Sequence, residues 1–227
     1  MNIDTLTIQS ILATPRQSVL YQVTDGTSFY VLKTPKNLSD SDLEAYEDEY
    51  ETLKKISHPV IPKYYAFYSD LYIPDFREPR PAILMEYVEG TPLSTMEYLT
   101  TKQLKKYILD LGDALLTLLM EGVLYTDLHP GNLILRDGQI KLIDYTRAYY
   151  YLRNPYPTYT PKISYQLDQN LKGQQLLVQA LTFLLLHLAE QFSVKNIPLS
   201  ILQCGEHPHS ALTFSDFLNQ LDREWEV

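Results

Sequence analysis

Short β-like runs, rich in hydrophobic residues, recur through the first third of the chain, and runs of this kind predict strands. Five runs stand out: residues 7–12, 19–23, 29–32, 64–68 and 82–87. The second and third are joined by Asp25-Gly26, a dipeptide typical of hairpin turns. The fourth and fifth are separated by a polar, proline-rich loop. The pattern therefore predicts a small sheet in this part of the chain.

A single helix is expected between the third and fourth strands. The run Ser39-Asp-Ser-Asp opens the helix, with Ser41 and Glu44 as its capping box. Pro59 and Pro62 stop it. The residues predicted to face the core recur at three- and four-residue spacing: Leu43, Tyr46, Tyr50 and Leu53. Glu49 lies on the same inward stripe. A carboxylate that points inward needs a cation beside it, because burying an unpaired charge is costly.

After Gly90 the periodicity changes to that of helices. One clean stripe ends at Gly122 and comprises Leu104, Ile108, Leu111, Leu115 and Leu118. A segment rich in Tyr and Pro, 149–163, is followed by an expected long apolar helix at about 171–192 and a short one at 214–225. A sheet with one helix, followed by helices, indicates an α+β fold.

Composition narrows the class of protein. The net charge of −9 and the pI near 5.0 argue against a nucleic-acid partner, because neutralising phosphates needs a basic surface. Cys204 is the single cysteine, so no internal disulfide is expected and a reducing cytoplasm is the natural compartment. The first residues lack the features of a signal peptide. The most apolar run, 181–188, is too short for membrane insertion, which needs about 18 apolar residues.

The segment from Tyr125 to Asp144 carries the candidate chemistry. Asp137-Gly138, a strong hairpin signal, lies midway between Asn132 and Asp144, so pairing of the flanking runs brings those two side chains to one end. An Asn carbonyl oxygen beside a carboxylate suits Mg²⁺, which takes its remaining ligands from substrate phosphates. Asp127, in the same irregular loop as Asn132, is placed to accept a proton from an attacking hydroxyl.

These residues resemble the catalytic elements of the eukaryotic-like protein kinase family. Asp127 and Asn132 keep the separation of the family's catalytic loop, and Ile140-Lys-Leu-Ile-Asp144 is similar to the strand that leads into its metal motif. The strand that ends in Val31-Leu32-Lys33 resembles the strand that carries the ATP-phosphate lysine. The resemblance makes Glu49 the partner of Lys33.

Residues 83–90 resemble the family's gatekeeper and hinge. By this resemblance Met85 would be the gatekeeper, and backbone groups of Glu86 and Val88 would hold the adenine. The implied cofactors are ATP and Mg²⁺.

Several positions depart from the family's pattern. The loop of residues 13–18 between the first two strands contains no glycine, so the phosphate lid is altered. Tyr125-Thr126 replaces His-Arg before the catalytic aspartate, and Thr146 replaces the metal-motif glycine. His129 stands in a His-Pro-Gly insertion, where contact with the transferred phosphoryl group and a structural hydrogen bond are both open interpretations. The C-terminal lobe is also short.

The resemblance implies one bilobal kinase-like domain over residues 1–227. It would consist of a small β-rich N-lobe with one helix, 1–88, and a shortened, mostly helical C-lobe, 89–227. The expected function is ATP- and Mg²⁺-dependent phosphoryl transfer, with a serine or threonine of a protein as acceptor. The departures leave two alternatives open: an ATP-binding pseudokinase or scaffold, and a small-molecule kinase. The oligomeric state is not predicted.

Overall fold

The computed structural model describes residues 6–168, 171, 173–206, 208 and 213–226. The chain divides into two compact units. The first unit comprises Met1–Ser57, Pro62–Val88 and Tyr150–Thr160, and the second comprises His58–Ile61, Glu89–Tyr149 and Pro161–Val227. Within the described part of the chain, no helix is both long and apolar enough to cross a bilayer.

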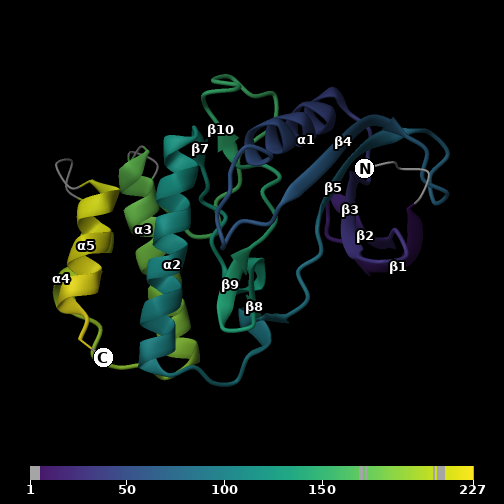
Figure 1. Cartoon of the computed structure of the whole chain (residues 1–227). Coiled ribbons are helices and arrows are strands. Elements are labelled where there is room, and N and C mark those ends of the chain that lie inside the picture. Colours follow the sequence, from purple (N-terminus) through teal and green to yellow (C-terminus); the bar gives the residue numbers. More distant parts are fainter. Residues whose placement is uncertain (1–5, 169–170, 172, 207, 209–212, 227) are drawn as a thin grey trace. The chain divides into compact units, whose positions relative to one another are not determined.

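The first unit is built on a five-stranded antiparallel sheet (Figure 1). Its strands are β1 (Thr7–Ala13), β2 (Ser18–Thr24), β3 (Phe29–Pro35), β4 (Tyr64–Leu71) and β5 (Arg80–Glu86). Their order in the sheet is β1-β2-β3-β5-β4. All five strands predicted from the short hydrophobic runs are therefore present, each within a few residues of its predicted ends.

One face of this sheet is covered by its own hydrophobic cluster. The buried members are Val19, Tyr21, Val23, Tyr30, Leu32, Ile73, Ala82 and Leu84. Alternate residues of a strand point to opposite faces, so Val31 and Lys33 project from β3 on the side away from this cluster. Lys33 pairs with Leu20 of β2 and Ile83 of β5. The position of Lys33 is thus fixed by strands on both sides.

Helix α1 (Asp40–Leu53) packs against β4 and β5 of the same unit. Its N-cap is Ser39, whose side chain accepts from the Asp42 N–H, so the predicted capping box at Ser41 was wrong by two residues. Asp42 lies three residues after Ser39, and its carboxylate accepts the Ser39 hydroxyl. The buried residues are Ala45, Tyr46, Asp48, Glu49 and Leu53. Leu43, expected on the buried stripe, is exposed.

Helices dominate the second unit. They are α2 (Thr101–Met120), α3 (Gln174–Gln191), α4 (Leu199–Glu206) and α5 (Phe214–Glu224). Helix α2 packs against α3 and α5, and α3 packs against α4 and α5 (Figure 1). All five residues of the predicted α2 stripe are buried. Helix α3 begins at Gln174, three residues after the predicted start, and the short α4 was not predicted.

The shorter elements of the second unit lie before α3. They are β6 (Thr91–Pro92), η2 (Leu93–Thr95), β7 (Val123–Leu124), η3 (Pro130–Asn132), β8 (Leu133–Arg136) and β9 (Gln139–Leu142). A two-residue strand, β10 (Tyr149–Tyr150), spans the boundary of the two units. Strands β6, β8 and β9 form a small antiparallel sheet in that order.

Candidate active site

The β8–β9 hairpin of the second unit brings two predicted metal ligands to one end. Asp137 and Gly138 both have positive φ, 49° and 76°, as a two-residue hairpin turn requires. Pairing continues past the strands, since the Ile143 N–H donates to the Asn132 carbonyl at 2.9 Å. Asn132 therefore lies beside the residue that precedes Asp144. The predicted hairpin is confirmed. Its register is determined by the two turn residues, which are local in sequence.

The amide of Asn132 is oriented by its hydrogen bonds. Its Nδ2 donates to the Tyr125 hydroxyl at 3.1 Å and to the Asp127 carbonyl at 3.0 Å. Tyr125 in turn donates its hydroxyl to the Ile143 carbonyl at 3.1 Å. Because the nitrogen is committed to protein acceptors, Oδ1 is the atom of Asn132 suited to a metal ion.

Tyr125 explains how the loop is held without the family's histidine. Its ring is buried and packs against Tyr145, with ring centroids 5.1 Å apart. Burial, with the nearby carboxylates of Asp144 and Asp127, holds the pKa of Tyr125 well above its ordinary value. The hydroxyl therefore stays protonated and can donate to the Ile143 carbonyl while accepting from Asn132.

The backbone at Asp144 adopts a conformation rare for a residue with a side chain. Its φ is 62°, in the left-handed region, and Arg147 follows with φ of 72°. Such strained residues concentrate at functional sites. Thr146, which stands where the family has glycine, does not have a positive φ, so this position does not require glycine.

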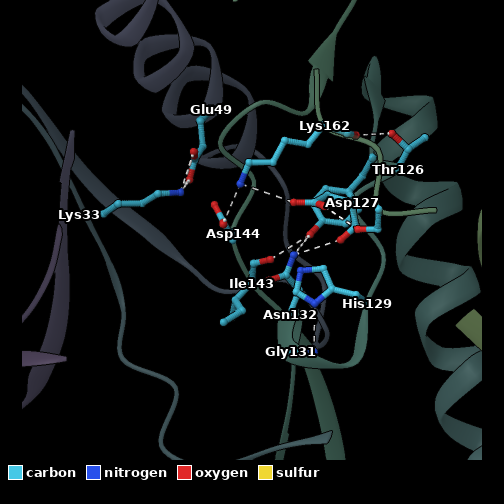
Figure 2. A network of polar contacts seen from close by, with 12 residues as sticks. Lys33, Glu49, Thr126, Asp127, His129, Gly131, Asn132, Ile143, Asp144 and Lys162 are labelled. Carbon is cyan, nitrogen blue, oxygen red and sulfur yellow. Dashed lines mark hydrogen bonds and ion pairs between the residues drawn. The ribbon is translucent and has the colours of Figure 1, made fainter. Parts of the chain in front are cut away.

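Asp127 lies in a network that links three parts of the second unit (Figure 2). Its Oδ1 accepts the Ser164 hydroxyl at 2.6 Å. Its Oδ2 lies 3.6 Å from the ammonium nitrogen of Lys162, which is also 3.3 Å from Oδ2 of Asp144. One lysine is thus shared by the predicted base and a predicted metal ligand.

Lys162 and Ser164 are site residues that the sequence did not indicate. The backbone of Lys162 is held at both ends: Thr126 Oγ1 donates to the Lys162 carbonyl at 2.7 Å, and the Lys162 N–H donates to the Arg147 carbonyl at 2.8 Å. Both residues come from the irregular Tyr- and Pro-rich segment, where no period or motif marks a residue as functional. Thr126, which replaces the family's arginine, is one of the anchors.

The structure gives His129 a local role. It is the N-cap of η3, and its Nδ1 accepts the Gly131 N–H at 3.2 Å. A Cβ at Gly131 would stand only 3.1 Å from the His129 ring, so the glycine permits this close approach. Of the two interpretations offered by the sequence, the hydrogen-bonding structural histidine fits the geometry.

The first unit contains the second group of predicted site residues. Lys33 Nζ lies 3.0 Å from both carboxylate oxygens of Glu49, and both side chains are buried, 2% and 0% exposed (Figure 2). Tyr64 donates its hydroxyl to Glu49 at 2.8 Å, and the Lys33 ammonium lies 5.7 Å from the ring centroid of Tyr46. The inward carboxylate has the cation that its burial demands.

Met85, Glu86 and Val88, the predicted adenine-binding residues, lie at and just beyond the end of β5. Met85 is buried and pairs with Val31 of β3. The Glu86 N–H donates to the Lys63 carbonyl at 2.8 Å. Of the two backbone groups of Glu86, the carbonyl is therefore the one left for the predicted contact with adenine.

The glycine-free lid is an exposed loop between β1 and β2. Lys36 holds it from both sides: the Lys36 ammonium donates to the Thr14 carbonyl at 3.0 Å, and its N–H donates to the Gln17 carbonyl at 2.9 Å. Two carbonyl groups of the glycine-free loop are therefore held by Lys36.

Helix α1, which carries Glu49, is also tied to the 150–160 segment of its own unit. Arg153 pairs with Glu47 at 2.9 Å and with the buried Asp48 at 2.8 Å. Tyr159 donates to Asp48 at 3.2 Å. Burial raises the pKa of Asp48 in spite of these partners.

Glu44, one turn earlier on α1, makes a second set of contacts to this segment. It accepts the Thr158 N–H at 2.9 Å and, in addition, the Thr158 hydroxyl and the Asn154 amide. The hydrogen bond from the Thr158 hydroxyl is the main cause that lowers the pKa of Glu44. Within less than two turns, α1 therefore presents four carboxylates: Glu49 is paired with Lys33, and the other three are bound by residues 153–159.

The donor set of the second unit fits Mg²⁺. Asp144 and Oδ1 of Asn132 offer two hard oxygen ligands at one end of a hairpin, and Mg²⁺ is commonly bound by few protein oxygens together with water and substrate phosphates. Nitrogen and sulfur donors, which softer metals prefer, are not part of this set.

One comparison with known proteins spans both groups of residues. The model of the protein kinase domain matches residues 16–173, more than half of the 227 residues. No curated protein matches the chain in sequence. The chain belongs to the protein kinase family, which supports a phosphotransferase activity of the kinase type.

Proposed function

We propose that the protein is an ATP- and Mg²⁺-dependent kinase that phosphorylates serine or threonine hydroxyls of a protein. One observation carries the proposal. Asp127 and Asp144 lie 3.6 Å and 3.3 Å from the ammonium group of Lys162, and the Asn132 amide donates to the Asp127 carbonyl, in a chain of the protein kinase family. A base and two oxygen ligands are what transfer of a phosphoryl group to a hydroxyl requires.

Each residue has a proposed role in this reaction. Lys33, oriented by Glu49, binds the α- and β-phosphates, and the end of β5 with Val88 holds the adenine. Asp144 and Asn132 hold Mg²⁺, which neutralises charge on the phosphates. Met85 limits the depth of the adenine site as gatekeeper.

Asp127 accepts the proton of the acceptor hydroxyl. The hydroxyl oxygen then bonds to the γ-phosphorus, the bond to the β–γ bridging oxygen breaks, and ADP leaves with that oxygen. Ser164, which donates to Oδ1 of Asp127, orients the carboxylate so that Oδ2 is the oxygen available to the acceptor.

The proposed unit of function is one kinase-like domain of residues 1–227, with lobes 1–88 and 89–227. The family match runs from residue 16 through residue 173 and so includes the boundary between these lobes, which supports a single domain. The single cysteine fits a reducing compartment such as the cytoplasm.

A labelling experiment tests the proposal. Purified protein is incubated with γ-labelled ATP, with and without Mg²⁺, and with either a basic protein acceptor or a mixture of small hydroxyl-containing metabolites. We expect Mg²⁺-dependent label on protein serine or threonine. Label on small molecules alone would identify a small-molecule kinase, and Mg·ATP binding without any transfer would identify a pseudokinase. Absence of nucleotide binding would refute the proposal as a whole.

A further inference from the structure

A lysine outside the recognised catalytic loop lies at the centre of the charged network of the second unit. Lys162 Nζ is 3.6 Å from Oδ2 of Asp127 and 3.3 Å from Oδ2 of Asp144 (Figure 2). Its side chain is 36% exposed, whereas those of Asp127 and Asp144 are 14% and 27% exposed. The ammonium therefore remains partly accessible while it contacts both carboxylates.

The position of this ammonium is defined by the structure around it. The Lys162 N–H and carbonyl are both bound, to the Arg147 carbonyl and to Thr126 Oγ1. Two residues later, Ser164 contacts the catalytic loop twice, through its N–H to the Thr126 carbonyl and its hydroxyl to Asp127. Because the backbone of Lys162 is held on both sides, little conformational entropy is lost when its side chain binds a ligand.

The catalytic loop itself offers no alternative cation. Residues 127–132, Asp-Leu-His-Pro-Gly-Asn, contain no lysine or arginine. His129 is bound within the loop through Nδ1. Stabilising the charge on a transferring phosphoryl group calls for a preorganised cation or N–H group at that place, and Lys162 meets this description.

The proposed roles of Asp127 and Asp144 indicate which part of the substrate lies near Lys162 during the reaction. If Asp127 takes the proton of the acceptor and Asp144 holds the metal ion on the phosphates, the transferred group passes between acceptor and metal. A cation within 3.6 Å of both carboxylates is thus within reach of that group.

We propose that Lys162 is a catalytic residue that binds the γ-phosphoryl group of ATP through its ammonium group and stabilises the negative charge on it during transfer. This role rests on the proposed kinase function. In the absence of nucleotide the same ammonium pairs with Asp127 and Asp144, and it exchanges these carboxylates for phosphate oxygens when Mg·ATP binds.

The test compares Lys162→Met, Lys162→Arg and the control Lys102→Met, which removes an exposed lysine of α2 in the same unit. Dissociation constants for Mg·ATP and Mg·ADP are measured by calorimetry on the full chain, and thermal unfolding confirms that each variant is folded. Lys162 contacts the γ-phosphoryl group, which ADP lacks. We therefore expect Lys162→Met to weaken ATP binding about tenfold while ADP binding changes less than about twofold.

Two further readouts follow from the same variants. Phosphoryl transfer by Lys162→Met should fall about 100-fold or more, and Lys162→Arg should restore part of the ATP-over-ADP preference. Titration with Mg²⁺ alone should show tighter binding to Lys162→Met than to the wild type, because the lysine no longer competes for Asp144. Lys102→Met should match the wild type throughout.

Specific results would overturn this role. Equal weakening of ATP and ADP binding, or no change in either, would show that Lys162 does not contact the γ-phosphoryl group. Tighter ATP binding by Lys162→Met would show that the lysine only obstructs the metal ligand. If the wild type and the Lys162 variants transfer phosphoryl groups equally well, the role of Lys162 is refuted but the proposed kinase function is not. If the wild type binds no nucleotide, the proposed function fails and takes this inference with it.

Discussion

The buried pair of Lys33 and Glu49 makes a quantitative prediction about stability. Two unit charges 3.0 Å apart attract by about 5 kcal/mol at an effective dielectric constant of about 20. Removing both ions from water costs a similar amount, so the pair as a whole contributes little. Removing one partner is different, because it leaves the other charge buried without its counter-ion, which costs about 3–5 kcal/mol.

The perturbation is a double-mutant cycle of Lys33→Met and Glu49→Gln. Methionine keeps most of the apolar stem of lysine, and glutamine retains an oxygen that can accept from the Tyr64 hydroxyl. We expect each single variant to lose about 3–5 kcal/mol of unfolding free energy. The double variant should lose less than the sum by about 2 kcal/mol or more, because neither charge is then left unpaired.

Urea denaturation of the four proteins measures these free energies, with an unchanged slope as the check that the unfolded states are comparable. The reasoning would be refuted if the two costs were additive within about 0.5 kcal/mol. Single costs below about 1 kcal/mol would equally contradict it, since they are typical of exposed pairs.

The other predictions concern contacts elsewhere in the chain. Arg153→Ala should cost about 1–2 kcal/mol and speed amide exchange in α1, because the buried Asp48 loses a cation; Arg136→Ala, at an exposed pair, should change stability by less than about 0.5 kcal/mol. Equal effects would show that the 150–160 segment does not stabilise α1. Burial raises the pKa of both Tyr21 and Tyr165 to about 12, so the folded state keeps protons that the unfolded chain releases near pH 10. Stability should therefore fall as pH rises from about 10 to about 12, and each Tyr→Phe change should remove its share of that loss. At pH 7, Tyr21→Phe should cost about 1 kcal/mol because it loses a 2.9 Å hydrogen bond to a carboxylate, whereas Tyr165→Phe should be neutral or stabilising because its buried hydroxyl has no hydrogen-bond partner in the described part of the chain. Denaturant midpoints of the two variants measure these changes in stability, and equal losses of stability at pH 7 would contradict the prediction.

Local signals were sufficient for much of the fold. The hydrophobic runs of the five strands, the Asp137-Gly138 turn and the stripe of α2 each depend on residues close in sequence, and the structure contains all three. The inward position of Glu49 followed from helical spacing, and its ion pair with Lys33 is present. Spacing could not place the N-cap, because Ser39 and Ser41 both precede an acidic residue by three positions, and only the backbone conformation chooses between them.

The rest of the site depended on contacts between residues distant in sequence. Lys162 reaches Asp127 and Asp144 from an irregular segment, where side-chain directions follow no period. The exchange of His-Arg for Tyr125-Thr126 could be seen in the sequence only as a departure. Its reason is tertiary: the tyrosine hydroxyl bridges Asn132 and Ile143, and the threonine anchors the segment that carries Lys162.

The most direct test of the central claim is the rate of phosphoryl transfer from γ-labelled ATP by the wild type and by Asp127→Asn, measured together with the dissociation constant for Mg·ATP. Asparagine removes the base but keeps an oxygen that can accept from Ser164. We expect transfer to fall by about 100-fold or more while nucleotide affinity changes less than about threefold, since Asp127 acts on the acceptor. Transfer at the wild-type rate by Asp127→Asn would contradict the assignment of the catalytic base and, with it, the proposed active site.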